Sequence, residues 1–320
     1  MLKAFPPVAD HDRLSVAALS RAVWVDLIAP DEAELAAVEA AFGVRVPTRA
    51  EISEIEVSSR LKVEHGALYM SAPLVTGVQG DGWDTAPTGF VLCPKACITV
   101  RFDKIAAFDA VEAALTDGAD LKPDLALTRL LEEVVDRAAD HLEFTADDLT
   151  KASKEIFRDP TQASKRLPRS GELRQLMTLV GRASDHISHA RYTLVCIGRM
   201  AQFVADRAHN WIDQGTLERL NAVHADIASL EQFEENMLSR AQLLQDAATA
   251  FISIEQNDVV KVLTIASVVG IPPVLVVGVY GMNFKVMPEL GWDFGYPYAL
   301  ALMVVSAVVP LIWFKVKGWM

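Results

Sequence analysis

The sequence predicts an α+β membrane protein with an N-terminal cytoplasmic α/β domain and a long helical stalk that continues into two C-terminal transmembrane helices. Three observations lead to this fold class. Short apolar runs alternate with helical patterns near the N-terminus, the 54 residues between Gly215 and Gly270 contain no Gly or Pro, and two uncharged apolar runs close the chain. The mean hydropathy of +0.22 excludes a disordered chain.

Residues 1–118 form the predicted α/β domain. Four short apolar runs, rich in strand-forming residues, are bounded by Gly, Pro or Asp, which is typical of strands. Pro30 and Asp31 are a start signal for a helix over residues 31–39. The predicted strands lie within residues 22–28, 67–78, 88–93 and 96–102.

Residues 119–214 predict an antiparallel pair of long helices. Pro160, Pro168 and Gly171 interrupt the helical pattern and separate the two helices. In the first helix, apolar side chains recur at spacings of three and four residues: Leu127, Leu130, Leu131, Val134, Val135 and Ala138.

Residues 215–260 predict a stalk helix, which runs without interruption into the first membrane span. The whole unbroken stretch would be roughly 80 Å long at 1.5 Å per residue. Such a helix needs neighbours to cover its apolar face, and this requirement suggests copies of the chain around an axis. The face comprises Leu230, Phe233, Met237, Leu244, Ala248 and Phe251.

Residues 261–320 predict a transmembrane domain of two helices. Residues 262–284 and 294–314 carry no charge, and about 20 apolar residues suffice to cross a bilayer core. Lys261 precedes the first run, whereas Lys315 and Lys317 follow the second. These lysines predict that both termini face the cytoplasm, with an outer loop at about 281–296. Two helices buried in a soluble core are the alternative.

The distribution of charge and cysteine agrees with a cytoplasmic (inner) membrane location. The first 256 residues carry a net charge of −13, against +1 for the remainder, and such an acid excess argues against a nucleic-acid partner. Cys93, Cys97 and Cys196 cannot form a full disulfide framework. The first residues are charged and contain Pro, so they do not predict a cleaved signal peptide.

A polar stripe on the first span favours a pore over a passive anchor. Two spans cannot enclose a pathway, but an oligomer could line one with a span from each subunit. Alternatively, Thr264 and Ser267 bond to their own helix or mediate helix packing. Pro272 and Pro273 indicate either a simple kink or a pore that flexes. The stripe comprises Asp246, Thr249, Ser253, Asn257, Val260, Thr264, Ser267, Ile271, Val274 and Gly278.

The segment after the first span carries the most specific motif. It reads YGMNF over residues 280–284 and MPEL over residues 287–290. This closely resembles the signature of the CorA family of magnesium transporters, in a short loop between two C-terminal spans. Weaker similarity to the family lies at residues 24–30, 47–49, 54–61 and 254–257.

The resemblance implies a funnel-shaped homopentamer that mediates divalent cation influx, with the first spans lining the pore. Gly281 and Met282 would shape the loop that presents Asn283, the principal selectivity residue. Amide oxygens suit the hydration shell of Mg²⁺, which gives up water reluctantly. Glu289 would raise the local cation concentration, or it is a solvated loop acid.

Further roles follow from the same resemblance. Asn257 corresponds to a polar pore ring, Leu263 to a hydrophobic constriction one position off the stripe, and Asp246 to an acidic ring or a plain solvated acid. Mg²⁺ would be both the transported and the regulatory ion, with no cofactor. Closure by cytosolic Mg²⁺ between neighbouring cytoplasmic domains would involve acidic residues. The candidates, each of which is by itself better explained as an ordinary surface acid, are Glu51, Glu54, Glu56 and Asp226.

Three other functions compete with magnesium transport. A zinc transporter of the ZntB type shares the architecture, but the intact Gly-Met-Asn motif and the lack of a Cys/His cluster favour Mg²⁺, with Co²⁺ and Ni²⁺ as minor cargo. A membrane-anchored enzyme is disfavoured, because no phosphate loop, nucleophile elbow or HExxH motif occurs. A scaffold protein would tolerate replacement of Asn283 without loss of ion flux.

Overall fold

The computed structural model describes residues 1–8, 13–77, 83–115, 122–158, 170–283, 285 and 287–319. The chain divides into two compact units. The N-terminal unit is Met1–Phe157 with Leu176–Gln245, and the C-terminal unit is Arg158–Gln175 with Asp246–Met320.

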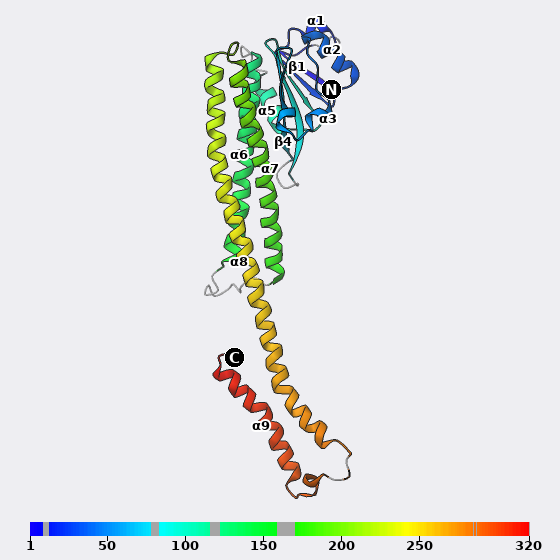
Figure 1. Cartoon of the computed structure of the whole chain (residues 1–320), viewed down its shortest axis with the longest axis vertical. Coiled ribbons are helices and arrows are strands. Elements are labelled where there is room, and N and C mark those ends of the chain that lie inside the picture. Colours follow the sequence, from blue (N-terminus) through cyan, green and yellow to red (C-terminus); the bar gives the residue numbers. More distant parts are fainter. Residues whose placement is uncertain are drawn as a thin grey trace. The chain divides into compact units, whose positions relative to one another are not determined.

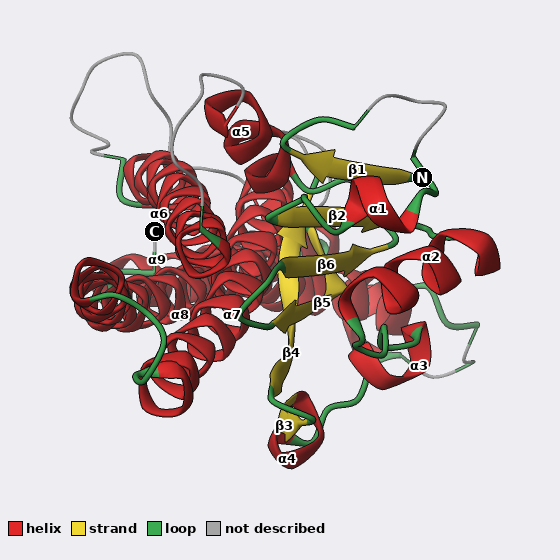
Figure 2. Ribbon diagram, turned by 90° about the horizontal axis from the view of Figure 1, so that it is seen from above, coloured by secondary structure: helices red, strands yellow, loops and turns green. Residues whose placement is uncertain are grey.

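A six-stranded mixed sheet organises the N-terminal unit, with the strand order β1-β2-β6-β5-β4-β3. Strands β2 and β6 pair in parallel, and every other neighbouring pair is antiparallel. Figure 2 shows the sheet between two layers of helices, with α2 and α3 on one side and α6 and α7 on the other. The strands are β1 Leu2–Phe5, β2 Trp24–Ile28, β3 Leu61–Glu64, β4 Ala67–Thr76, β5 Asp84–Leu92 and β6 Cys97–Arg101.

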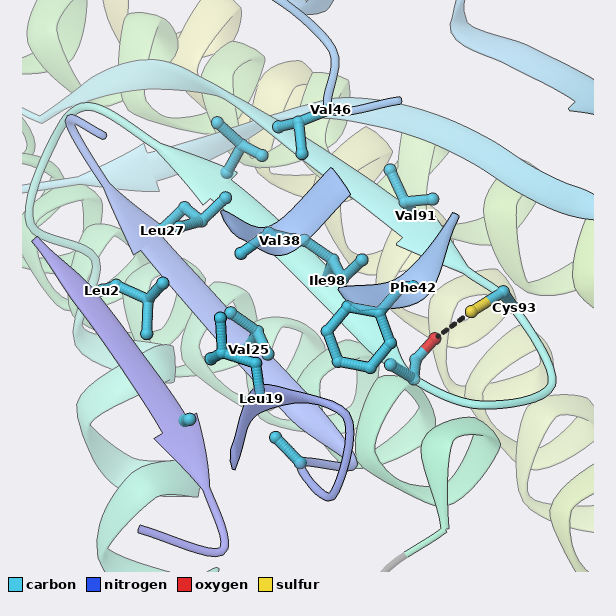
Figure 3. Packing of buried hydrophobic residues seen from close by; sticks show 14 of the residues in the cluster. Leu2, Leu19, Val25, Leu27, Val38, Phe42, Val46, Val91, Cys93 and Ile98 are labelled. Atoms are coloured by element: carbon cyan, nitrogen blue, oxygen red, sulfur yellow. Dashed lines mark hydrogen bonds between the residues drawn. The ribbon is translucent and has the colours of Figure 1, made fainter. Parts of the chain in front are cut away.

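The core on the α2 side is apolar because side chains alternate along the strands. Val25 of β2 and Ile98 of β6 point to the same layer as Val38 and Phe42 of α2, and all four are buried (Figure 3). The opposite face carries Trp24 instead, which packs near Phe108 of α5 with 6.3 Å between ring centroids. The sheet is thus buried on both faces.

Local sequence explains where α2 begins and ends. The side chain of Asp31 accepts a hydrogen bond from the backbone N–H of Glu34, whose side chain accepts from the backbone of Asp31 in return. This capping box satisfies two donors at the start of α2, Glu32–Phe42. Gly43 ends the helix in the left-handed conformation with φ of 69°, which costs Gly little strain.

Long helices form the rest of the chain, and α6, α7 and the first part of α8 lie side by side (Figures 1 and 2). Arg219 of α8 forms a two-pronged ion pair with Glu132 of α6. Thr193 of α7 donates to the backbone oxygen of Pro73 in β4 at 2.9 Å. The helices are α1 Val16–Leu19, α2, α3 Arg49–Ile52, α4 Val57–Arg60, α5 Ala106–Leu115, α6 Pro123–Ile156, α7 Ser170–Ala208, α8 Gln214–Tyr280 and α9 Gly295–Val316, with a short 3₁₀ helix at Pro288–Gly291.

The structure confirms the predicted strands β2, β4, β5 and β6 and the helix at α2, and it adds two strands that the sequence pattern missed. A single helix, α8, covers both the predicted stalk and the first span. The predicted break between the paired helices falls largely at 159–169, outside the described residues.

Candidate functional site

The predicted stripe lies on one face of α8. At about 100° per residue in an α-helix, its members from Asp246 to Gly278 fall within a sector of about 100°, with Val274 and Asn257 at its two edges. Thr264 lies inside that sector, and Leu263 lies about 20° beyond the edge that Val274 marks. Both positions therefore border one surface, although the simple step pattern reached only Thr264.

Hydroxyl groups in the stripe are bonded to their own helix. Thr264 donates from Oγ1 to the backbone oxygen of Val260 at 2.8 Å, and Ser267 donates from Oγ to that of Leu263 at 2.8 Å. Bonding to their own helix was one of the alternatives that the sequence left open for Thr264 and Ser267, and the structure shows these bonds. Each hydroxyl oxygen still keeps lone pairs that can accept a hydrogen bond from an ion's water, so back-bonding and pore lining are compatible.

Apolar members of the stripe are exposed in the single chain. Val260, Ile271 and Val274 have exposed fractions between 59% and 70%, and Leu263 beside the stripe is 66% exposed. The helices α8 and α9 are both long and apolar enough to cross a membrane. Exposed apolar surface of this extent needs cover from lipid or from other protein chains.

The C-terminal end of the chain returns to the start of the first span. After the outer loop, α9 runs back in the opposite direction to the end of α8 (Figure 1). Trp319 and Asn257 line one cavity of about 370 Å³, together with Asp258 and Lys261. Lys261 pairs with Asp258 at 3.2 Å. The basic ends of both predicted spans therefore lie on the same side, as expected for a hairpin.

Helix α8 continues through Pro272 and Pro273 and ends where the Gly-Met-Asn motif begins. The N–H of Gly281 donates to the backbone oxygen of Val277 at 2.9 Å. A Cβ atom at this glycine would lie 3.0 Å from that same oxygen, so a side chain here would crowd the last turn. Asn283 follows outside the helix with an exposed side chain, which is the placement that an ion-facing amide requires.

Glu289 lies in the short 3₁₀ helix of the outer loop, and its side chain is half-buried. The loop then turns tightly into α9. A Cβ atom at Gly295 would lie 2.2 Å from the backbone oxygen of Glu289, so this position excludes a side chain. The close approach positions Glu289 beside the start of α9. The sequence pattern alone did not indicate this role of Gly295.

Among the regulatory candidates, Glu51 already has partners. Its Oε2 accepts from Arg45 Nη1 at 2.8 Å, from the backbone N–H of Thr48 at 2.8 Å and from Thr48 Oγ1 at 2.9 Å. The hydrogen bond from Arg45 is the main reason that the pKa of Glu51 falls to about 2. The carboxylate is therefore charged at neutral pH, but one of its oxygens caps α3.

The other candidates differ in their surroundings. Glu54 and Glu56 have exposed side chains near α4, whereas Asp226 lies on α8. Asp136 of α6 has a raised pKa, first because it is partly buried and then because acids surround it, with Asp226 among them. Among the described residues no group of three or more His, Cys, Asp or Glu side chains could hold a metal ion within one chain. Asp136 was not among the regulatory candidates predicted from the sequence. The signal that could have identified it is the recurrence of acids at helical spacing in α6: Glu132, Glu133, Asp136 and Asp140.

Comparison with known proteins supplies the family. The model of the CorA-like Mg²⁺ transporter protein family matches residues 20–315. Magnesium transport protein CorA of Pasteurella multocida is 31% identical over 97% of this chain and 95% of its own length. The protein of the same name from Escherichia coli K12 is 30% identical over 94% and 93%.

Solved structures share the fold. The complete CorA magnesium transporter of Methanocaldococcus jannaschii matches with a TM-score of 0.73 at 18% identity, over 93% of this chain and 91% of that one. The full-length CmaX protein matches with a TM-score of 0.64 at 16% identity, over 92% and 88%. Together with the sequence relatives, this agreement over nearly the whole length leads to one conclusion: the chain belongs to the CorA-like Mg²⁺ transporter family.

Proposed function

We propose that this chain transports Mg²⁺ into the cell, with Co²⁺ and Ni²⁺ as minor cargo. The single observation that carries the proposal is the intact Tyr-Gly-Met-Asn sequence at the end of the first apolar helix, with Met-Pro-Glu-Leu at short spacing. Relatives that span more than nine-tenths of the chain are named as magnesium transport proteins. The family is one of transporters and not of enzymes, in agreement with the prediction from the sequence.

The pathway would be built by several copies of the chain. One chain has only two spans and cannot surround an ion, whereas five α8 helices could place their stripes around a common axis. The exposed apolar side chains of the stripe support a partner of this kind, because a neighbouring copy would cover them. We therefore propose a funnel-shaped homopentamer, with the predicted segments 1–118, 119–214, 215–260 and 261–320 as its working domains.

Asn283 would act first on an arriving ion. An amide oxygen can accept hydrogen bonds from the water molecules of hydrated Mg²⁺ without removing them. Gly281 and Met282 would hold the loop, and Glu289 would concentrate cations near it. Further along, the ion would pass Gly278, Val274, Ile271, Ser267, Leu263, Val260, Asn257 and Asp246.

The position of the basic residues supports the proposed orientation in the cytoplasmic (inner) membrane. Lys261 and Lys315 flank the two spans on the side where Trp319 meets α8. By the positive-inside rule that side is cytoplasmic. Both termini and the acidic N-terminal unit would then be cytoplasmic, and the chain's partners would be lipid, divalent cations and its own copies.

Cytosolic Mg²⁺ would also regulate the pore. The acid excess of the N-terminal unit would cause repulsion between neighbouring copies, which a bound divalent cation would reduce. Asp226 is the best placed of the four candidates, because its charge acts on Asp136 of α6, which has further acids around it. Mg²⁺ is cargo and regulator in this scheme, which involves no cofactor.

Flux measurements on purified protein test the proposal. Wild type, Asn283→Ala and the control Asn221→Ala, an exposed amide on the N-terminal part of α8, are placed in liposomes that contain a magnesium-sensitive dye. We expect rapid Mg²⁺ entry with wild type and with the control, and loss of entry with Asn283→Ala. Zn²⁺ entry without Mg²⁺ entry would move the chain to the ZntB type. Absence of both fluxes from folded oligomers would reject a transport function.

A further inference from the structure

A small cavity lies in the N-terminal unit between the α4 and β4 region and helix α7. Its volume is about 100 Å³, and Arg60, Ser71, Tyr192, Cys196 and Arg199 contribute to its wall. None of these residues belongs to the predicted ion pathway or to the regulatory candidates. The wall combines two arginines and three side chains that end in a hydroxyl or a thiol with the apolar residues Ile55, Leu61 and Val195.

The guanidinium group of Arg60 is held in place by three neighbours. Nε donates to the backbone oxygen of Glu54 at 2.6 Å, Nη2 donates to Tyr192 Oη at 2.6 Å and Nη1 donates to Cys196 Sγ at 3.2 Å. The group also lies 5.2 Å from the centroid of the Tyr192 ring. Since guanidinium has five N–H donors, two remain for a ligand, and their direction is already determined.

Neither arginine forms an ion pair with a carboxylate in the part of the chain that the structure describes. The two guanidinium groups also act on the same thiol: burial raises the pKa of Cys196, and the charges of Arg60 and Arg199 oppose that rise. Their positive charges therefore converge at the cavity.

Ser71 gives an independent indication of a ligand. Its side chain is 6% exposed, and its Oγ has no hydrogen-bond partner. A buried hydroxyl without a partner costs free energy. Ser71 lies in the wall of the cavity beside Arg60, and its Oγ is closed to solvent in the present side-chain conformation. A rotation about its Cα–Cβ bond would let this hydroxyl donate to an acceptor atom in the cavity.

We propose that this cavity binds an oxyanion of the phosphate class. A tetrahedral phosphate group offers acceptor oxygens in several directions, so it can accept from Arg60, Arg199 and Ser71 at once. A carboxylate has two oxygens in one plane and can meet fewer of these donors. A cavity of about 100 Å³ accommodates one phosphate group, and the remainder of a phosphorylated metabolite would extend past the exposed side chain of Ile55.

Binding measurements on the full-length protein in detergent, at constant Mg²⁺ concentration, test this site. Inorganic phosphate is titrated by calorimetry into wild type, Arg199→Gln, Ser71→Ala and the control Arg207→Gln, an exposed arginine further along α7. We expect saturable binding of one phosphate per chain, about tenfold or more weaker in Arg199→Gln, because a hydrogen bond to a charged group is lost. Ser71→Ala should weaken binding several-fold, and Arg207→Gln should leave it unchanged.

Thermal unfolding with and without phosphate provides a second readout, because a ligand that binds the folded state raises the unfolding temperature. Arg60→Gln is a secondary variant, since Arg60 also holds Tyr192 and the backbone of Glu54. The proposal is overturned if wild type shows no saturable binding, or if Arg199→Gln and Ser71→Ala, both folded, bind phosphate as wild type does. A nucleoside monophosphate that binds tenfold tighter than phosphate would identify a phosphorylated metabolite as the source, and equal affinity would identify free phosphate.

Discussion

Arg101 and Asp26 form an ion pair inside the sheet, where each side chain is only 2% exposed. Nη2 and Nε of Arg101 lie 2.9 and 3.1 Å from Oδ2 of Asp26, and Thr99 donates to Oδ1 at 2.7 Å. The pair joins neighbouring strands β2 and β6, which are parallel. A buried pair with this many hydrogen bonds is most costly to disrupt when only one partner is removed.

We therefore expect Asp26→Asn to lower the free energy of unfolding by about 3–5 kcal/mol, because Arg101 would remain charged and buried. The N-terminal unit within the full-length protein would be followed by chemical denaturation. Asp148→Asn is the matched control, since the pair of Asp148 with Lys151 lies at the surface and should contribute little. Equal stability of the two variants would contradict the prediction.

Glu234 should make stability depend on pH. It is fully buried, neither carboxylate oxygen has a partner, and burial raises its pKa to about 7. An acid with a raised pKa in the folded state favours the protonated form, so its ionisation destabilises the fold as the pH rises from about 4.5 towards 7 and above.

Glu234→Gln removes that ionisation. The variant should be more stable than wild type at pH 8, by up to about 3 kcal/mol, with the advantage disappearing near pH 5. Unfolding temperatures of both proteins at several pH values provide the measurement. Glu235→Gln, an exposed neighbour on α8, should show no such trend, and a pH-independent difference for Glu234→Gln would argue against the raised pKa.

Ser267 and Ser306 distinguish pore lining from back-bonding. Both donate to a carbonyl oxygen of their own helix at 2.8 Å, to Leu263 and Met303 respectively. Only Ser267 lies in the stripe. Ser267→Ala should therefore lower Mg²⁺ flux into liposomes several-fold, whereas Ser306→Ala should have little effect. If both variants changed the flux equally, the stripe would not be the pore surface.

Glu289 should act through its charge on arriving cations. Glu289→Gln is expected to slow Mg²⁺ entry at low ionic strength and to approach the wild-type rate at about 1 M salt, where charges are screened within about 3 Å. Entry rates would be measured across a salt series, with Glu235→Gln as the control far from the loop in sequence. A salt-independent defect would instead indicate a structural role in the loop.

Asp226 and Glu51 should respond differently as Mg²⁺ sensors. We expect Mg²⁺ to protect the N-terminal unit of the full-length protein from trypsin, and we expect Asp226→Asn to remove much of that protection. Glu51→Gln should retain it, because one carboxylate oxygen of Glu51 is already used by Arg45 and Thr48. Identical digestion of wild type with and without Mg²⁺ would reject regulation through these acids.

Local sequence patterns predicted many of the strands and helices of the fold. Strands β2, β4, β5 and β6 are apolar runs with clear boundaries, and Asp31 marks the start of α2. The strands β1 and β3 were not predicted, because each has four residues and includes a lysine. Their strand character depends on pairing with β2 and β4, which local composition does not encode.

The sequence by itself determined the long continuous α8, the two apolar helices and the Gly-Met-Asn motif that points to the family. These features depend on residues near one another in the chain. Only the tertiary structure decided that Glu51 is held by Arg45, that Asp226 acts on Asp136 of α6, and that Arg60 meets Cys196 across 136 positions of sequence. Hydrogen bonds and charges act over a few ångströms of space, so a pattern along the chain cannot specify which distant side chains they join.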